Sequence, residues 1–167
     1  MQLQYDALFK LWRKGKARWF KKVKRNIVGN RESFTSCLDL EDYPNSVVDV
    51  FIELPQTEAG SRCAGICAAS MALADAGLEM KDLVCAVSVG KVDDKLLVDL
   101  DYSEESYKDG LTADIPIAML VNSGKVTLLQ MDGEAKKQEL MKLLEMGKKA
   151  CFDIYEIQKK ALKEKYQ

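Results

Sequence analysis

The sequence has no histidine among its 167 residues. This absence excludes imidazole general bases, Ser-His-Asp triads and histidine-ligated metal sites. No apolar run approaches the roughly 20 residues of a membrane-spanning helix, and the N-terminus lacks the continuous apolar stretch of a secretory signal. Cysteine occurs five times but never as a CxxC pair. We therefore expect a cytoplasmic protein with reduced thiols and without a zinc site.

Charge is distributed unevenly along a chain whose formal net charge is −1. Residues 1–37 hold 10 Lys/Arg against 2 Asp/Glu, whereas residues 38–167 hold 15 against 24, so the two parts carry +8 and −9. We place a boundary near Cys37. The first part fits a basic amphipathic helix that binds phosphates or an anionic membrane surface, or alternatively a solvated extension. Its apolar side chains are Leu8, Leu11, Trp12, Trp19, Phe20 and Val23.

The second part shows ordered strand and helix signals. The β-branched run 47–54, bounded by two prolines, predicts a strand. The small residues from Gly60 to Ala76 predict a helix that Gly77 ends and that can lie close to a sheet. Further expected elements are a hairpin of 84–92 with 96–101, a hairpin of 115–121 with 126–131, and a helix from about 134 to 165. The order β-α-β-β-β-β-α favours an α/β fold of the α+β type, with a mixed, mainly antiparallel sheet and packed helices.

The turn Gly60-Ser61-Arg62 opens the small-residue helix. A helix N-terminus presents unpaired N–H groups and the positive end of the helix dipole, which suit an anion. The Ser61 hydroxyl and the Arg62 guanidinium add donors that match a phosphate group. The alternative is a serine N-cap next to a surface arginine.

Carboxylates gather between two of the expected strands. They are Asp99, Asp101, Glu104, Glu105, Asp109 and Asp114. Such a cluster can hold Mg²⁺ or supply a general acid, and the alternative is a solvated acidic loop. Cys63 and Cys67 are four residues apart and could present two thiols on one helix face, although small buried residues on a closely packed helix explain the same spacing.

Several runs of the sequence together resemble the RNase PH family, and most of all its archaeal exosome catalytic branch. They are VVDVFIELPQTEAGSRCAGICAASMALADAG, MKDLVCAVSVGKVDDKLLVDLD, ADIPIAM and KVTLLQMDG. The resemblance extends from about Leu38 to the end, so we divide the chain into a basic segment, 1–37, and the C-terminal part of an RNase PH-like domain, 38–167.

The resemblance implies a 3′→5′ exoribonuclease that uses inorganic phosphate as co-substrate. Phosphate would attack the last phosphodiester of single-stranded RNA and release a nucleoside 5′-diphosphate, and the reverse reaction would add tails. The implied partners are an inactive homologous subunit, which alternates with this one in a hexameric ring, and RNA-binding cap subunits. Gly60, Ser61 and Arg62 fall on the family's phosphate-binding turn. Asp114 falls on the second of two acidic positions, where it would bind Mg²⁺ or protonate the leaving 3′-oxygen.

The first acidic position departs from the family pattern. The family carries Asp in an ED pair six residues before the second position, whereas Glu105 lies nine residues before Asp114, with an insertion around residues 108–110. Glu105 or Asp109 could take this role, or neither could. Because Glu also stands at this place in inactive family members, the alternative function is a non-catalytic ring or scaffold subunit.

Residues 1–37 lack the βα-rich half and the arginine-rich motif that the family carries before this point. Back-translated with permissive codons and read one nucleotide over, they can give a string that contains RPGGSRRSRE, which is similar to that motif. We therefore expect a shifted reading frame, a chain that is inactive by itself, and exposed apolar surface that the other half would cover. A third possibility is an unrelated small protein whose basic helix binds nucleic acid or membrane.

Overall fold

The computed structural model describes residues 7–9, 33–54, 56 and 58–166. The named elements of these residues, in chain order, are β1 (Ala7–Phe9), η1 (Leu40–Asp42), β2 (Val50–Ile52), α2 (Ser61–Asp75), β3 (Val84–Val92), β4 (Lys95–Val98), α3 (Tyr102–Glu105), β5 (Thr112–Leu120), β6 (Lys125–Leu129), β7 (Asp132–Gly133) and α4 (Lys137–Lys165). Within these residues no helix is long and apolar enough to cross a bilayer.

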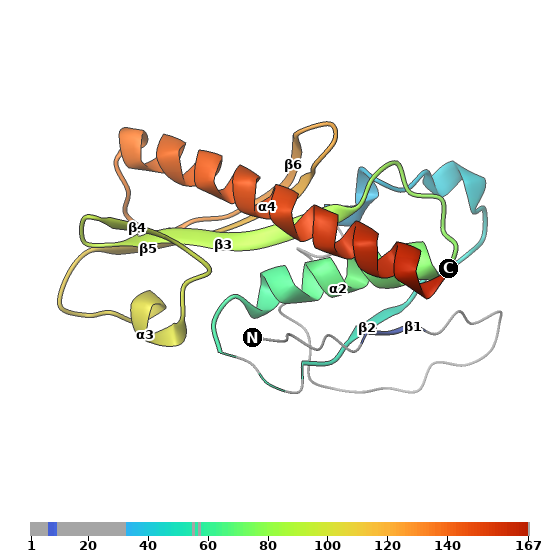
Figure 1. The fold of residues 1–167 in the computed structure, drawn as a ribbon, viewed down its shortest axis with the longest axis horizontal. Coiled ribbons are helices and arrows are strands. Elements are labelled where there is room, and N and C mark those ends of the chain that lie inside the picture. Colours follow the sequence, from blue (N-terminus) through green and yellow to red (C-terminus); the bar gives the residue numbers. More distant parts are fainter. Residues whose placement is uncertain (1–6, 10–32, 55, 57, 167) are drawn as a thin grey trace.

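The main sheet has five strands in the order β4-β3-β5-β6, with β7 paired to β5. All of its pairings are antiparallel, and both predicted hairpins are present. Figure 1 shows α4 on one side of this sheet, with α2 and α3 on the other. The predicted α/β fold with a mainly antiparallel sheet and packed helices is confirmed.

Strand β3 is buried on both faces of the sheet. Successive residues of a strand point to opposite faces. Ala86 accordingly packs in one core cluster with Ile66 of α2, and Val87 packs in a second with Leu143 of α4. This double burial explains why the strand reads as a nearly continuous apolar run instead of an alternating one.

Helix α2 lies close to β3, as its small side chains predict. The N–H of Val84 donates to Ser70 Oγ at 2.8 Å, and the N–H of Ala86 lies 3.2 Å from Cys67 Sγ. Such contacts between side chains of the helix and the backbone of the strand need the two elements to approach closely. The helix ends at Asp75, near its expected end, and Gly77 follows with a φ of 79°.

Helix α4 packs on the opposite face through a glycine and a buried amide. A Cβ on Gly147 would lie only 2.9 Å from Ile117 Cδ1, so this glycine lets the helix approach the sheet. Further along, the buried Gln158 donates from Nε2 to the Cys67 carbonyl at 3.1 Å and accepts from Cys85 Sγ at 3.1 Å. One amide thus connects α4 to both α2 and β3.

Three predicted elements are corrected by the structure. The strand expected over 47–54 is only Val50–Ile52, and among the described residues it pairs with β1 alone. The strand expected over 96–101 is Lys95–Val98, because Asp99 takes a φ of 62° that breaks the extended backbone. The acidic stretch is not a plain loop: Asp101 caps the short helix α3, accepting from the Glu104 N–H, while the Glu104 side chain accepts from the Asp101 N–H.

The basic segment is described only in part. Leu8 lies in β1, opposite Phe51, so at this residue the expected amphipathic helix is wrong and the backbone is paired as a strand. The other apolar residues of that expected helix, from Leu11 to Val23, lie outside the described residues. Phe34 and Cys37 are buried in the α2 core cluster, so the last residues of the 1–37 segment pack with the domain.

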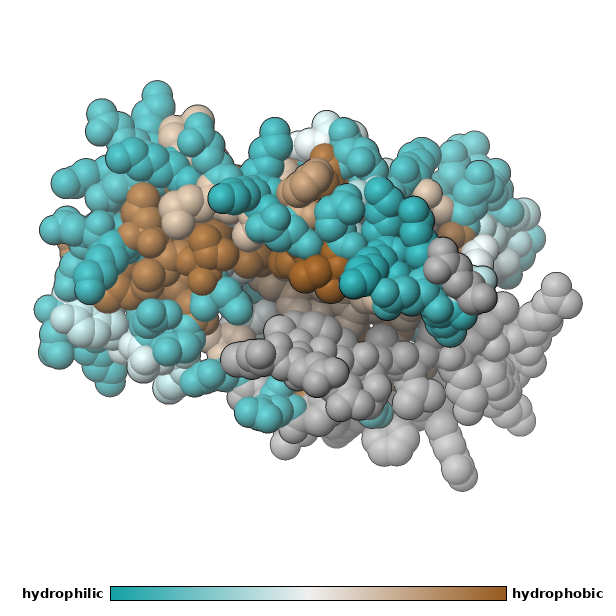
Figure 2. Space-filling view, in the orientation of Figure 1, coloured by the Kyte–Doolittle hydropathy of each residue, from teal (hydrophilic) through white to brown (hydrophobic). Residues whose placement is uncertain are grey.

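Large apolar side chains are exposed at several places on the described surface. They include Val47, Phe51, Val98, Leu111, Leu129, Met141, Phe152 and Ile157. Figure 2 shows apolar colour gathered between the first half of α4 and the β3–β4 hairpin. The expectation of exposed apolar surface therefore holds for the described residues, whereas the element that would cover it stays a prediction.

Candidate active site

The N-terminus of α2 is open and free of a side-chain cap from the described residues. Gly60 is the N-cap and takes a left-handed φ of 64°, so the alternative reading of Ser61 as a capping residue is wrong. The first helical hydrogen bond runs from the Ala64 N–H to the Gly60 carbonyl. The three preceding N–H groups, which include those of Ser61 and Arg62, have no acceptor within the helix and lie where an anion would bind.

Asp114 lies on the same side of the sheet as α2. In the sheet register it stands opposite Gly90 of β3 and Asp132 of β7. Ala118 and Leu120 of the same strand pack in the α2 core cluster. Because strand residues two apart share a face, the half-buried Asp114 lies on this face, beyond the end of the α2 contact.

A chain of contacts links the α2 turn to Asp114. A Cβ on Gly60 would lie 3.5 Å from Asp99 Oδ1. The Asp99 N–H donates to the Ser88 carbonyl at 2.7 Å, and Ser88 Oγ donates to Asp114 Oδ1. A short chain of contacts therefore connects the predicted phosphate turn with the predicted catalytic carboxylate.

The pKa of the buried Cys63 thiol, in the first turn of α2, is consistent with Asp114 lying near this end of the helix. Burial raises the pKa of Cys63 to about 12; the negative charge of Asp114 also raises it, whereas the nearby Arg62 lowers it. Both charged groups therefore lie within electrostatic reach of the first turn of α2. A guanidinium and a carboxylate near a helix N-terminus can hold a phosphate and act on the bond that it attacks.

Glu105 reaches this site from α3. Partial burial raises the pKa of Glu105, and the carboxylates of Asp114 and Asp132 raise it further. Glu105 therefore lies within electrostatic reach of Asp114 and of its cross-strand neighbour Asp132. Glu105 and Asp109 are both exposed, and Gly110, the neighbour of Asp109, lies against Asp93 in the β3–β4 turn. Both candidates for the first acidic position stay predictions, and the electrostatic interaction with Asp114 supports Glu105.

The described residues contain no group of three or more His, Cys, Asp or Glu side chains that could hold a metal ion. Magnesium in phosphoryl-transfer sites is commonly held by one or two carboxylates, with water and substrate phosphates as its other ligands. Asp114 fits this role with Oδ2, because Ser88 occupies Oδ1.

The cysteines do not contribute a nucleophile to this site. All five are free and buried. Burial raises the pKa of Cys67 to about 11 and that of Cys151 to about 12. The thiols therefore stay protonated at neutral pH. Cys63 and Cys67 are small buried residues of a closely packed helix, in agreement with the structural reading of their spacing.

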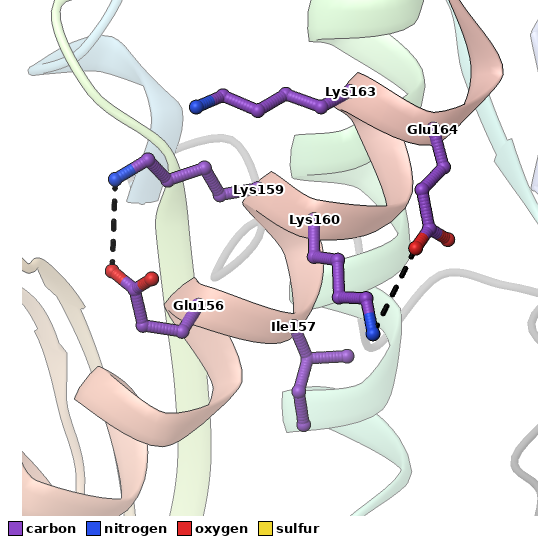
Figure 3. A pocket seen from close by; sticks show the side chains of 6 residues that line it. All are labelled: Glu156, Ile157, Lys159, Lys160, Lys163 and Glu164. Carbon is purple, nitrogen blue, oxygen red and sulfur yellow. Dashed lines mark ion pairs between the residues drawn. The ribbon is translucent and has the colours of Figure 1, made fainter. Parts of the chain in front are cut away.

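A shallow concavity lies elsewhere, along the last turns of α4 (Figure 3). It is lined by Glu156, Ile157, Lys159, Lys160, Lys163 and Glu164. Lys159 pairs with Glu156 and Lys160 with Glu164, each at 3.7 Å. Its charges are largely compensated within the helix, so this surface does not compete with the α2 turn as a phosphate site.

Two residues of the site escape sequence reasoning. Ser88 is a lone hydroxyl in a strand of apolar residues, a pattern that indicates a buried polar contact but does not identify its partner. Asp132 precedes Gly133 in the run MDG, and only the β5–β7 pairing brings it opposite Asp114, 18 residues earlier in the chain.

Comparisons with known proteins agree with this architecture. Residues 22–79 match the model of the 3′ exoribonuclease family, domain 1, and residues 82–150 match domain 2. The first match begins inside the 1–37 segment, whose boundary stays a prediction. The crystal structure of rice (Oryza sativa) Rrp46 superposes with a TM-score of 0.73 over 88% of this chain and 68% of that chain, at 19% identity, and supports the fold alone.

Curated relatives carry the name exosome complex component Rrp41. The protein from Methanopyrus kandleri is 47% identical over 137 residues, which make up 82% of this chain and 56% of the relative. The protein from Thermococcus gammatolerans is 46% identical over 136 residues, 81% of this chain and 53% of the relative. The chain spans about half the length of the curated relatives it matches. Both family domains and these identities together show that the chain belongs to the RNase PH family of 3′ exoribonucleases.

Proposed function

We propose that this chain is a catalytic subunit of an archaeal-type exosome that degrades single-stranded RNA from the 3′ end with inorganic phosphate. The observation that carries the proposal is the open N-terminus of α2, with Gly60, Ser61 and Arg62, connected through Ser88 to Asp114. Relatives named exosome complex component Rrp41 support the assignment to the complex.

The residues suggest a division of roles. The N–H groups at the start of α2 and the Arg62 guanidinium hold the attacking phosphate and keep it oriented. Asp114 protonates the leaving 3′-oxygen, or would hold a Mg²⁺, which would supply positive charge there. Glu105, from α3, is the second carboxylate. The products are a shortened RNA and a nucleoside 5′-diphosphate, and high diphosphate concentration drives the reverse tailing reaction.

The proposed partners are an inactive homologous ring subunit and RNA-binding cap subunits. The test therefore compares two forms: the 167-residue chain, and a chimera in which the N-terminal half of the Methanopyrus kandleri relative precedes Leu38. Each is mixed with the homologous partner subunit from that organism and incubated with single-stranded RNA, with and without phosphate. We expect the chimera to release nucleoside diphosphates only when phosphate is present, and the shorter chain to release none.

The outcomes separate the functional classes. Diphosphate release that requires phosphate supports the proposal. If both forms only retard RNA on a gel and release no nucleotide, the subunit is a non-catalytic scaffold. Equal turnover by the 167-residue chain without the chimera's extension would show that the short form is itself active and would overturn the expectation of inactivity.

A further inference from the structure

Ser88 is 2% exposed and lies in the middle of β3, between Val87 and Val89. A buried hydroxyl needs a hydrogen-bond partner. Two other buried polar side chains contribute to packing: Ser70 accepts from the Val84 N–H, and Gln158 connects α4 to α2 and β3. The Ser88 hydroxyl, in contrast, donates to a side chain of the proposed active site, Asp114 Oδ1.

The main chain of Ser88 is engaged as well. Its carbonyl accepts from the Asp99 N–H at 2.7 Å, and the Asp99 carboxylate lies next to Gly60. The strand that carries Ser88 is paired on both sides, with β4 and with β5. The backbone of Ser88 is therefore fixed by the sheet register opposite Pro116 and by the hydrogen bond from Asp99, between the residue next to Gly60 and the strand that carries Asp114.

A carboxylate that lies on the rim of a sheet can adopt several χ1 rotamers. A hydroxyl fixed in the sheet selects the rotamer that brings Oδ1 onto it, and the other oxygen, Oδ2, is then left for the reacting groups. Catalytic side chains need this kind of support, because a small misplacement of the reacting atom lowers the rate by large factors.

We propose that Ser88 is a positioning residue that holds Asp114 in one rotamer, with Oδ2 directed to the reaction site. The expected effect of Ser88 on the reaction rate rests on the proposed function. The expected effect of Ser88 on the Asp114 rotamer is independent of that function. The Ser88 hydroxyl transfers no proton to the substrate, so it acts only through Asp114.

The first experiment uses the 167-residue chain. NMR three-bond couplings between Hα and Hβ of Asp114 report whether χ1 occupies one well or is averaged. Ser88→Thr keeps the hydroxyl group and adds a methyl group. Ser88→Val has the shape of the threonine variant but no hydroxyl group. Ser88→Ala removes the hydroxyl group without adding volume. We expect one rotamer in the wild type and in Ser88→Thr, and averaged couplings in Ser88→Val and Ser88→Ala.

Thermal unfolding of each variant shows which ones are folded. If the extra methyl group prevents the Thr and Val variants from folding, the wild type and Ser88→Ala still decide the question. A single Asp114 rotamer in a folded variant without the hydroxyl overturns the proposal.

The second experiment uses the chimera with its partner subunit. Loss of the hydroxyl lowers kcat about ten-fold or more and leaves KM for RNA and phosphate nearly unchanged, and Ser88→Thr restores kcat. A change in KM alone, or equal kcat in the Thr and Val variants, contradicts the positioning role. If the wild-type chimera itself releases no diphosphate, the proposed function fails, and the couplings still decide whether Ser88 positions Asp114.

Discussion

The two ends of α2 are built in opposite ways. At the C-terminal end, the Leu78 N–H donates to the Leu73 carbonyl and the Gly77 N–H to the Ala74 carbonyl, so local backbone groups satisfy the last turn. The Asp75 carboxylate next to them accepts from Lys165 Nζ at 2.5 Å. At the N-terminal end, Gly60 caps the helix without a side-chain hydrogen bond.

This difference indicates which end of the helix is built for a ligand. Capping residues such as Ser, Thr or Asp stabilise an ordinary helix start by about 1 kcal/mol, and glycine does so less well. With a glycine cap the helix loses only a few tenths of a kcal/mol, and its first N–H groups stay available to an anion. The closed end anchors α2 to α4, and the open end is linked through Asp99 and Ser88 to Asp114. The fold and the proposed site therefore depend on the same helix.

The largest effect is expected at the open end, from the carboxylate that the helix faces. Asp114→Asn keeps the shape of the side chain and removes its charge and basicity, so the phosphorolytic rate of the chimera falls by about 100-fold or more. Glu105→Gln lowers the rate about ten-fold, since Glu105 lies near Asp114. The measurement is diphosphate release at saturating RNA and phosphate, with thermal unfolding to confirm that each variant is folded.

Asp109→Asn is the matched control, because the neighbour of Asp109, Gly110, lies against Asp93 in the β3–β4 turn. It should leave the rate unchanged. If Asp109→Asn reduced the rate as strongly as Asp114→Asn, Asp109 and not Glu105 would be the first acidic residue of the site.

The next largest effect is a loss of stability, expected at Gln158, the buried side chain that connects α4 to α2 and β3. Gln158→Ala leaves the Cys67 carbonyl and the Cys85 thiol without their partner, so the free energy of unfolding should fall by about 2–3 kcal/mol. Ile157→Ala is the control, since its side chain is 68% exposed and should cost about 0.5 kcal/mol or less. Denaturant unfolding of the 167-residue chain measures both, and equal losses would show that the amide does not hold α4 to α2.

A left-handed glycine stands at each end of α2 and allows a direct comparison of the two ends. Gly60 has a φ of 64° and Gly77 a φ of 79°, and a Cβ on Gly77 would meet nothing within 4 Å. Alanine at either position adopts the left-handed region at a cost of about 1–2 kcal/mol. We expect Gly60→Ala and Gly77→Ala to lower stability by similar amounts in denaturant unfolding.

Phosphate should distinguish these two variants. A ligand that binds only the folded chain stabilises it as its concentration rises. Inorganic phosphate should therefore stabilise Gly77→Ala as much as the wild type, and should stabilise Gly60→Ala less, because the new side chain enters the turn. Equal stabilisation of both variants would place phosphate elsewhere on the chain.

Much of this architecture can be predicted from the sequence, because its signals are local. The small residues of α2, the two hairpin turns and the apolar stripe of α4 each determine an element within a short window. The turn Gly60-Ser61-Arg62 was predicted for the same reason, since a helix start and its flanking donors are adjacent in the chain.

The parts that were missed depend on contacts between distant residues. The backbone turn at Asp99 ends β4 earlier than its apolar pattern suggests. The role of Ser88 depends on the pairing of β3 with β5, and that of Asp132 on the pairing of β5 with β7. No local pattern gives the register of these strand pairs. The sequence therefore predicts that the carboxylates gather in one region, but not which of them lie opposite one another.

The smallest loss of stability is expected from Asp75→Asn, at the closed end of α2. Its dependence on pH shows whether the charged contact between Asp75 and Lys165 causes it. Hydrogen bonds from Lys165 and then Tyr166 lower the pKa of Asp75 below its ordinary value. A carboxyl group whose pKa is lower in the folded state contributes stability above its unfolded pKa of about 3.9 and loses it as the pH falls through the folded value. Asp75→Asn should therefore cost a small amount of stability at neutral pH.

The difference between wild type and Asp75→Asn should vanish in acid, below the folded pKa of Asp75. Asp75 in turn raises the pKa of Lys165, so the same difference should also shrink in alkali, as the pH rises through the folded pKa of that lysine. Unfolding midpoints across this pH range measure both limits. Glu164→Gln, which removes an exposed pair within α4, is the control and should show almost no difference at any pH. An Asp75→Asn difference that persists unchanged in acid would mean that packing, and not the charged contact with Lys165, closes this end of the helix.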